Sequence, residues 1–236
     1  IENEISFNDL DLDYNDTELA IEDKWILSNL QDLIKEVSYN MEQYDLGIAL
    51  TKIYNFLWDN FCDWYIEMVK ARLQGEDQLS KLTAQSVLNH VLCQCMALLH
   101  PYMPFVTEDI YRSLLHKDGL LIKQAWPTVD EKLIFPEEAA QMELLIEVIH
   151  GVRNIRAEMS VPHNRKSGLM VVSESAVVRS TFENAAQSLE NLAGINQVTI
   201  HTDNSDIPET AITLPFSAGT AYLPLEDLID PEEEKK

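Results

Sequence analysis

Residues 54–70 read YNFLWDNFCDWYIEMVK, an unusually aromatic stretch around which the rest of the chain can be placed. At about 100° per residue, its large apolar side chains gather along one side of an α-helix, which predicts a side that faces a core. That side carries Tyr54, Leu57, Trp58, Phe61, Tyr65 and Met68. The opposite side carries Phe56, Asn60, Asp63, Glu67 and Lys70, with Trp64 at its margin. The stretch therefore predicts a helix with one buried side and one exposed side that combines rings with polar groups.

Apolar residues at three- and four-residue spacing predict further helices on both sides of this one. The predicted helices cover residues 16–44, 47–73, 79–99, 107–116 and 136–161. Asp16 and Thr107 are expected to cap their helices, and Pro136 is expected to open the last one. Five helices with short connections predict a helical bundle.

After Pro162 the sequence changes to short β-branched runs, which predict strands. The runs are residues 168–172, 197–201, 211–214 and 221–223, with a helix at 176–192 that ends before Gly194. The chain is therefore expected to be mainly α. A bundle of about five helices with an acidic N-terminal lead-in would occupy residues 1–163, a small α/β subdomain would occupy 164–229, and residues 230–236 would begin a further, truncated element.

The charge balance limits what the chain can bind. Forty acidic and 17 basic residues give a formal net charge of −23. Phosphate affinity comes from cations, so this balance argues against an autonomous, nonspecific nucleic-acid binder. One window differs: residues 151–168 hold Arg153, Arg156, Arg165 and Lys166 against Glu158 alone, four bases minus one acid. That segment is the leading candidate for contact with a polyanion.

Three cysteines make no disulfide framework, which fits a reducing cytoplasm. Cys93 and Cys95 lie two residues apart on a predicted helix and point away from each other, so they cannot chelate one ion. The six histidines are scattered, and phosphate-binding glycine motifs and a nucleophile elbow are missing from the sequence. No run reaches the roughly 20 apolar residues of a membrane helix. We therefore expect a cytoplasmic protein without membrane contact, catalytic residues or a metal site.

The aromatic stretch allows two interpretations. Rings beside fixed donors and acceptors suit unpaired RNA bases, which stack on rings while their edges form hydrogen bonds. Alternatively, the helix packs against a second neighbour and Asp63 or Glu67 pairs with an internal arginine. Arg156 lies on an apolar stripe and is expected to pair with a carboxylate of the bundle. For Arg153, Arg165 and Lys166, phosphate contact and simple solvation are both open.

Four segments, taken together, resemble a known family. They are DKWILSNL (23–30), FCDWYIE (61–67), HPYMPFVTE (100–108) and RNIRAEMSVP (153–162). The third is common to the leucyl, isoleucyl, valyl and methionyl enzymes of one class I group. The second and fourth in combination are much more specific, and the chain resembles the C-terminal region of valyl-tRNA synthetases over nearly its whole length.

The resemblance implies a class I anticodon-binding bundle followed by an α/β unit that leads into a C-terminal coiled-coil arm. The parent enzyme would join valine to its tRNA with ATP and Mg²⁺ in a catalytic domain, whose HIGH and KMSKS signatures this sequence lacks. This piece alone would be inactive and need no cofactor. Its expected partners are the anticodon stem and loop of the valine tRNA and the catalytic domain of the same chain, and we expect a monomer.

On this interpretation, Trp64 or Phe56 is the expected stacking platform, and Asn60, Asp63, Glu67 and Lys70 are expected edge or phosphate contacts. Arg153, Arg165 and Lys166 are expected to contact backbone phosphates, which position the RNA without reading its sequence. The acidic balance predicts weak, strongly salt-dependent binding. Two alternatives are the same domain of an isoleucyl- or leucyl-tRNA synthetase, and a helical scaffold that docks only onto protein domains.

Overall fold

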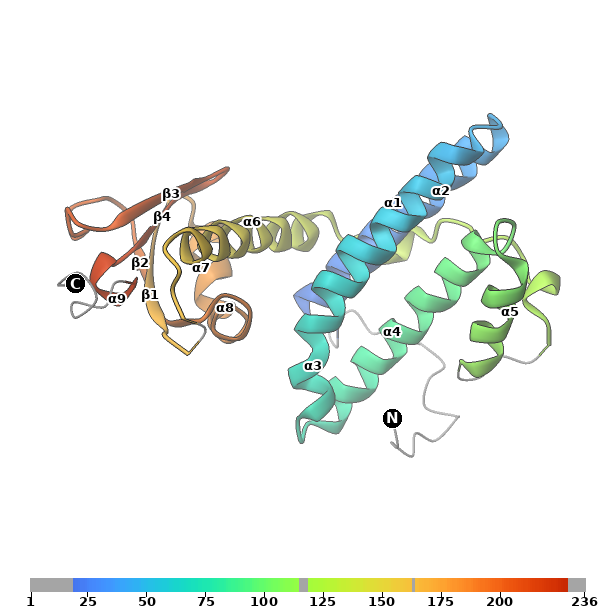
Figure 1. Cartoon of the computed structure of the whole chain (residues 1–236), viewed down its shortest axis with the longest axis horizontal. Helices are drawn as coiled ribbons and strands as arrows, with labels where there is room; N and C mark the ends of the chain where they lie inside the picture. Colours follow the sequence, from blue (N-terminus) through green and yellow to red (C-terminus); the bar gives the residue numbers. More distant parts are fainter. Residues whose placement is uncertain (1–18, 115–118, 163, 229–236) are drawn as a thin grey trace. The chain divides into compact units, whose positions relative to one another are not determined.

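The computed structural model of the chain describes residues 19–114, 119–162 and 164–228. The chain forms two compact units, residues 1–139 and residues 140–236, and is mainly helical with one small sheet, as predicted (Figure 1). The division between the two units falls inside the last long helix. The predicted cap Asp16, the acidic lead-in and the predicted arm at residues 230–236 lie outside the described residues.

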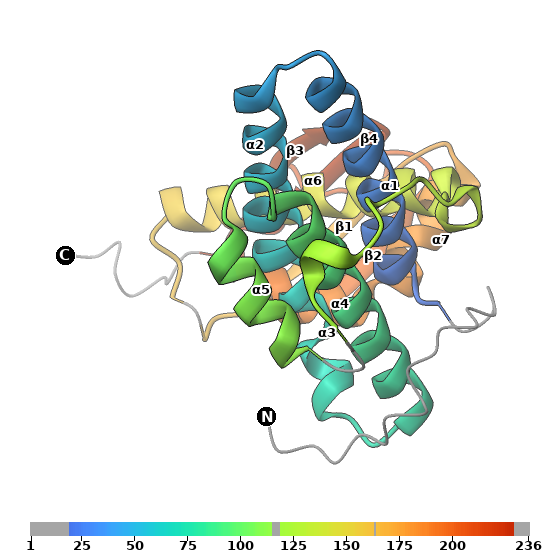
Figure 2. The same ribbon diagram turned by 90° about the vertical axis from the view of Figure 1, so that its right-hand side faces the viewer.

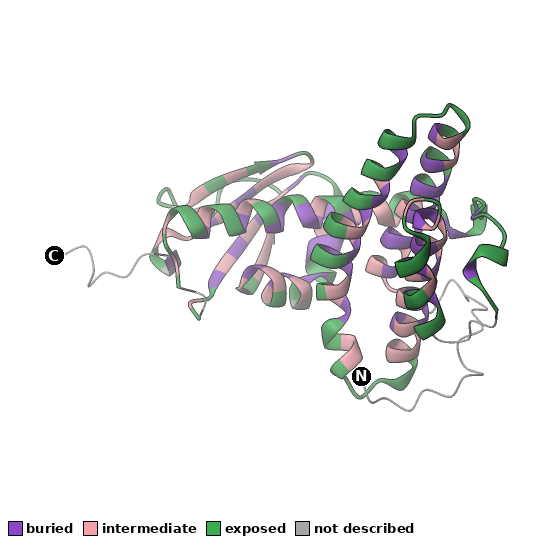
Figure 3. Ribbon diagram, turned by 45° about the vertical axis from the view of Figure 1, so that its right-hand side comes forward, coloured by how far each residue is buried: buried purple, intermediate pink, exposed green. Residues whose placement is uncertain are grey.

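Helices make up the first unit. They are α1 (Ile21–Glu42), α2 (Leu46–Asn55), η2 (Phe56–Tyr65), α3 (Ile66–Gln74), α4 (Gln78–Leu99) and α5 (Pro104–Ser113), followed by the short turns η3 (Leu121–Lys123) and η4 (Glu131–Leu133) and the start of α6 (Pro136–Glu158). α1 contacts α2, η2 and α4, and α4 also contacts α3 and α5 (Figures 1 and 2). The buried positions lie along the sides where these helices meet (Figure 3).

Two helix starts depend on local chemistry. The Asp23 carboxylate accepts a hydrogen bond of 3.0 Å from the backbone N–H of Ala20, which satisfies one donor before the first turn of α1. α5 begins at Pro104, whose fixed φ suits the first helical position. The expectation that Thr107 caps this helix is wrong: Thr107 lies within α5, and its hydroxyl donates to the carbonyl of Met103 at 2.8 Å.

The aromatic stretch is one uninterrupted helix from α2 to α3, but its middle segment, η2, is a π-helix. At the end of this segment, the N–H of Ile66 donates to the carbonyl of Phe61, five residues earlier. A π-helix has wider turns than an α-helix, so side chains assigned at α-helical spacing drift away from their expected faces.

As a result, four aromatic rings lie on the opposite side of the helix from the side predicted at α-helical spacing. Tyr54 and Trp58, predicted to be core residues, are 60% and 58% exposed. Phe56 and Trp64, predicted to face solvent, are only 5% and 7% exposed. The predicted faces are therefore wrong for these rings, although Phe61 and Tyr65 are buried as expected.

A buried polar cluster fixes this helix against its neighbours. The hydroxyl of Tyr65 donates to the fully buried carboxylate of Asp23 on α1, with an O···O distance of 2.6 Å. Arg72 on α3 lies 2.9 Å from carboxylate oxygens of Asp23 and Glu22, and its Nε donates to Ser80 of α4 at 2.9 Å. Because a buried carboxylate requires partners, the cluster restricts how α1, η2, α3 and α4 can pack.

The helix α4 has the length and composition of a membrane span, the one such helix among the described residues. Within its most apolar window, however, 61% of the residues are buried in the structure. This is the pattern of a core helix in a bundle, and it carries little weight as evidence for membrane insertion.

The second unit is a four-stranded mixed sheet with helices. It contains most of α6, then β1 (Ser167–Val172), α7 (Ala176–Asn184), α8 (Ala186–Ala193), β2 (Ile195–His201), β3 (Ile212–Phe216), β4 (Gly219–Leu223) and α9 (Leu225–Leu228). The strand order is β2-β1-β4-β3, with β1 and β2 parallel and the other two pairs antiparallel. A parallel pair needs a crossover, which α7 and α8 supply.

α6 packs on this sheet at Gly151, where an added Cβ would lie 2.4 Å from the side chain of Leu214 on β3. The single helix predicted at residues 176–192 is two helices that meet at Ala185. α8 ends at Gly194, which has the left-handed φ of +71° that a helix C-terminus favours.

The burial of the two tryptophans in η2 predicts opposite effects on stability. Trp64→Ala is expected to lower the free energy of unfolding by about 3–5 kcal/mol, since a buried ring leaves a cavity. Trp58→Ala is expected to change it by less than about 1 kcal/mol, because that ring is largely exposed. Urea unfolding of both variants checks this, and equal losses would contradict the burial of Trp64 relative to Trp58.

A second prediction concerns pH. Burial and the neighbouring Asp23 raise the pKa of Glu22 above its usual 4.5, despite the ion pair with Arg72. A carboxyl group with a raised folded-state pKa contributes its full stability below the unfolded pKa and loses it as pH rises through the folded pKa. Relative to wild type, Glu22→Gln should therefore gain stability as pH rises from about 4 to about 7.

Urea unfolding at several pH values measures this difference, with Glu42→Gln on the exposed end of α1 as the control. A Glu22→Gln difference that is flat with pH, or that moves the other way, would show that the pKa of Glu22 is not raised in the folded state.

Candidate functional site

The first unit contains an apolar groove of about 680 Å³. It runs between the α2–η2 helix and the segment where α4 leads into α5. Its lining is Leu50, Thr51, Tyr54, Leu57, Trp58, Cys62, Leu99, Tyr102 and Met103. None of these lining residues is an acid or a base.

Two rings of the groove form a parallel pair. The planes of Tyr54 and Trp58 lie within 1° of each other, with ring centroids 6.3 Å apart. Both side chains are more than half exposed. Exposed, parallel ring faces can stack a planar ligand such as a nucleobase, because every base has a π-face.

The other wall of the groove is held by Tyr102. Its hydroxyl donates to the carbonyl of Leu46 at 2.8 Å, which ties the α4–α5 connection to the first turn of α2. Burial raises the pKa of Tyr102, so the phenol stays protonated and remains a donor at neutral pH. The wall facing the two rings is therefore positioned by a hydrogen bond between distant segments.

Cys62 adds no charge to the groove. Cys62 is exposed, but its partial desolvation, followed by the nearby Asp63, raises the pKa of its thiol above the usual 9.0. The thiol is therefore neutral at physiological pH and a poor nucleophile. The groove offers stacking and shape to a ligand and little electrostatic attraction.

The residues predicted for base contact are not assembled as one surface. Phe56 and Trp64 are buried, Asn60 is half-buried, and Asp63 is exposed. Glu67 and Lys70 are exposed and pair with each other at 2.5 Å. None of them lines the groove.

Sequence reasoning missed Tyr54 and Trp58 as surface residues because their four-residue spacing fits the core of an α-helix. Helical periodicity also assigns no role to Tyr102 and Met103. The motif HPYMPF, with proline after Met103, was the available signal that the groove's other wall lies there.

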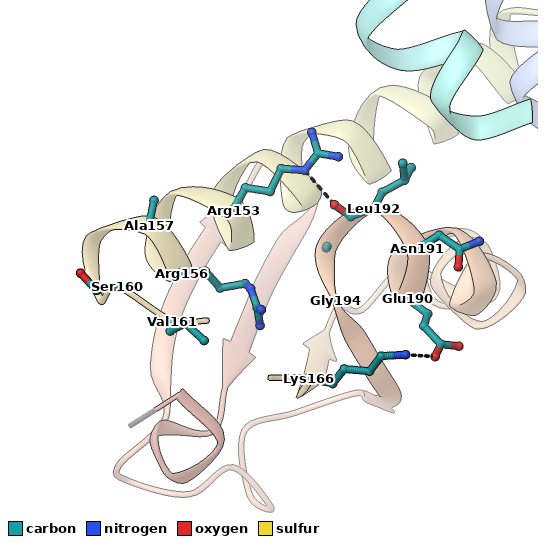
Figure 4. Close-up of a pocket in the computed structure, with 11 residues that line it drawn as sticks. Arg153, Arg156, Ala157, Ser160, Val161, Lys166, Glu190, Asn191, Leu192 and Gly194 are labelled. Carbon is teal, nitrogen blue, oxygen red and sulfur yellow. Dashed lines mark hydrogen bonds and ion pairs between the residues drawn. The ribbon is translucent and has the colours of Figure 1, made fainter. Parts of the chain in front are cut away.

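The predicted phosphate contacts lie in the second unit (Figure 4). Arg153 and Lys166 line a hollow of about 710 Å³ together with Arg156. The Nε of Arg153 donates to the carbonyl of Leu192 at 2.8 Å, and Lys166 pairs with Glu190. Arg165 lies outside this lining and donates to the carbonyl of Glu226 at 3.0 Å.

Arg156 was expected to pair with a carboxylate, and this expectation is wrong. Its Nη2 donates to the carbonyls of Pro162 and Arg165, at 3.2 and 2.7 Å. Both acceptors lie in the connection between α6 and β1, so the arginine fastens that connection to the helix end. Carbonyl acceptors this close in sequence follow from the turn after α6, which helical periodicity does not predict.

Within the described part of the chain, no cluster of three or more His, Cys, Asp or Glu side chains is arranged to hold a metal ion.

Comparison with known proteins identifies the family. Residues 23–172 match the model of the anticodon-binding domain of tRNA ligase. The valine–tRNA ligase of Bacillus thuringiensis subsp. konkukian is 42% identical over 232 residues, which is 98% of this chain and 26% of that protein. The valine–tRNA ligase of Staphylococcus haemolyticus is 41% identical over 234 residues, 99% of this chain and 26% of that protein.

The chain spans about a quarter of the length of these curated relatives. The match includes both α2–η2–α3 and the α4–α5 connection, and it confirms the resemblance inferred from the four sequence segments. The chain belongs to the anticodon-binding domain family of tRNA ligases, and its homologues are valine–tRNA ligases.

Proposed function

We propose that the helical unit binds the anticodon loop of the valine tRNA, within a parent protein that joins valine to this tRNA using ATP. The observation that carries the proposal is the exposed, parallel pair of Tyr54 and Trp58 on an uncharged groove, inside the segment that matches the family. Anticodon bases are unpaired, so their faces are available to such rings.

The burial of Phe56 and Trp64 changes the assignment of roles. We assign these two rings to the support of the helix and assign stacking to Tyr54 and Trp58. Asn60, Asp63, Glu67 and Lys70 remain candidates for contacts to base edges or phosphates at the border of the bound loop. Lys70 would have to exchange its Glu67 partner, which costs little for an exposed pair.

The charge of the chain sets the expected affinity. With a net charge of −23 and a groove without cations, the helical unit gains selectivity from stacking and gains little long-range attraction. Binding by this chain alone should be weak and should weaken further with salt. The parts of the parent protein outside this chain would supply most of the affinity.

The first test of this function is equilibrium binding of a labelled valine tRNA transcript at low salt. Trp58→Ala should weaken binding by about 5- to 150-fold, the equivalent of losing one base stack. Tyr39→Ala is the matched control, since Tyr39 is 63% exposed on α1 and does not line the groove. Equal behaviour of the two variants would contradict the proposal.

A second arm changes the RNA. Replacing the central and third anticodon bases should weaken binding to wild type by about tenfold, or about 1.4 kcal/mol. The same replacement should have a smaller effect on Trp58→Ala, since the reading groove is already damaged. RNA binding that is unchanged by both the anticodon replacement and Trp58→Ala would favour a scaffold that docks only onto protein.

A further inference from the structure

The hollow at the end of α8 carries a net positive charge within a chain that is acidic overall. Its charged lining residues are Arg153, Arg156, Lys166 and Glu190, three bases minus one acid. Arg153 and Arg156 come from α6, Lys166 precedes β1, and Glu190 lies on α8 (Figure 4). A local surplus of +2 in a chain of −23 marks a place where an anion is favoured.

Arg156 forms the floor of this hollow, and the described residues supply no carboxylate to it. The residue is only 9% exposed, and its Nη1 has no hydrogen-bond partner within the described part of the chain. Its two carbonyl acceptors satisfy Nη2, and no described residue supplies a counter-ion to the positive charge. A buried cation in this state has an unfavourable free energy that a nearby anion would reduce.

The turn after α8 leaves room for the guanidinium. A Cβ on Gly194 would lie 3.3 Å from Nη2 and 3.4 Å from Cζ of Arg156, closer than most side-chain contacts. Glycine also suits the left-handed φ at this position. The backbone therefore approaches the arginine closely, and the buried charge is held by a specific turn.

The two other cations of the lining, Arg153 and Lys166, are exposed. Lys166 pairs with Glu190, and the side chains of this pair remain 47% and 38% exposed. An exposed pair of this kind contributes little to stability, so Lys166 can exchange the carboxylate for another anion at small cost. Arg153 keeps its Nε on the carbonyl of Leu192, which orients its exposed guanidinium.

We propose that this hollow binds one phosphate group of the tRNA backbone, an inference that rests on the proposed function. Arg153 and Lys166 make the direct contacts. Arg156 acts from the floor through its charge, since its Nη1 is closed to solvent. A phosphate held here positions the RNA and carries no sequence information, which separates this site from the groove that contacts bases.

The test measures tRNA affinity of the full chain as a function of salt. The double variant Arg153→Ala/Lys166→Ala should weaken binding about tenfold at low salt and reduce the slope of log K against log salt by about one. The control Lys35→Ala/Lys123→Ala removes the same charge from exposed positions of the first unit and should leave the slope nearly unchanged. A slope that changes equally in both double variants would overturn the site.

A second variant is expected to strengthen binding, and a gain in affinity cannot result from misfolding. Glu190→Gln removes the competing carboxylate and should tighten tRNA binding several-fold, whereas Glu174→Gln, an exposed acid of the same unit, should have little effect. A loss of affinity with Glu190→Gln, or an equal gain with Glu174→Gln, would contradict the proposal.

Two further measurements distinguish a failure of the phosphate site from a failure of the proposed function. The variant Arg153→Ala/Lys166→Ala should still discriminate between cognate and altered anticodons. If the wild-type chain itself shows no such discrimination, the proposed function is contradicted and the phosphate site is not. Inorganic phosphate is titrated against chloride at equal ionic strength while the amide signals of Leu192 and Gly194 are followed by NMR. Phosphate-specific shifts without any change in the tRNA salt slope would show a site for free phosphate and overturn its assignment to RNA.

Discussion

The hydrogen bond from Tyr65 to the buried carboxylate of Asp23 sets the rotational position of the helix on which the groove depends. It joins η2 to α1 at 2.6 Å, in a cluster that also includes Arg72 and reaches α4 through Ser80. Tyr65 is the last residue of the π-helical segment, so fixing its ring in the core fixes the direction of the residues before it. With Tyr65 and Phe61 inside, the wider turns carry Trp58 outward beside Tyr54.

In the proposed function, the two units contribute different interactions to RNA binding. The groove of the helical unit presents aromatic faces and no charged lining residue, so it can distinguish bases but attracts RNA weakly. The hollow of the α/β unit presents cations around a buried arginine, so it can hold a phosphate but reads no sequence. A chain with 40 acids can bind a polyanion when its few cations are concentrated in this way.

Much of the fold follows from local sequence signals. Pro136 marks the start of α6 and Gly194 the end of α8 through their backbone preferences, and short β-branched runs mark the strands of the sheet. The family follows from the combination of four segments. These features are local, or are shared with relatives, so they are readable without a structure.

The residues of the candidate site are harder to predict from the sequence, for two physical reasons. A π-helix forms no recognisable pattern at α-helical spacing, so that spacing puts Trp58 on the buried side and Trp64 at the margin of the exposed side, whereas Trp58 is exposed and Trp64 is buried. The partners of Arg156 are backbone carbonyls in a turn, which depend on chain geometry and not on side-chain type. Predicting residues 54–70 correctly would have required knowing that Tyr65, and not Trp64, meets Asp23.

The central claim is that the exposed rings of η2 meet the anticodon bases. It can be tested directly with the indole N–H signals of the four tryptophans during titration with an anticodon stem–loop RNA. Trp58 should show the largest shift, since a stacked base changes the local ring current. Trp25 and Trp64 are buried, and Trp126 donates its indole N–H to Ser38, so their signals should move little. A bound RNA that shifts Trp64 or Trp126 and leaves Trp58 unchanged would contradict the account.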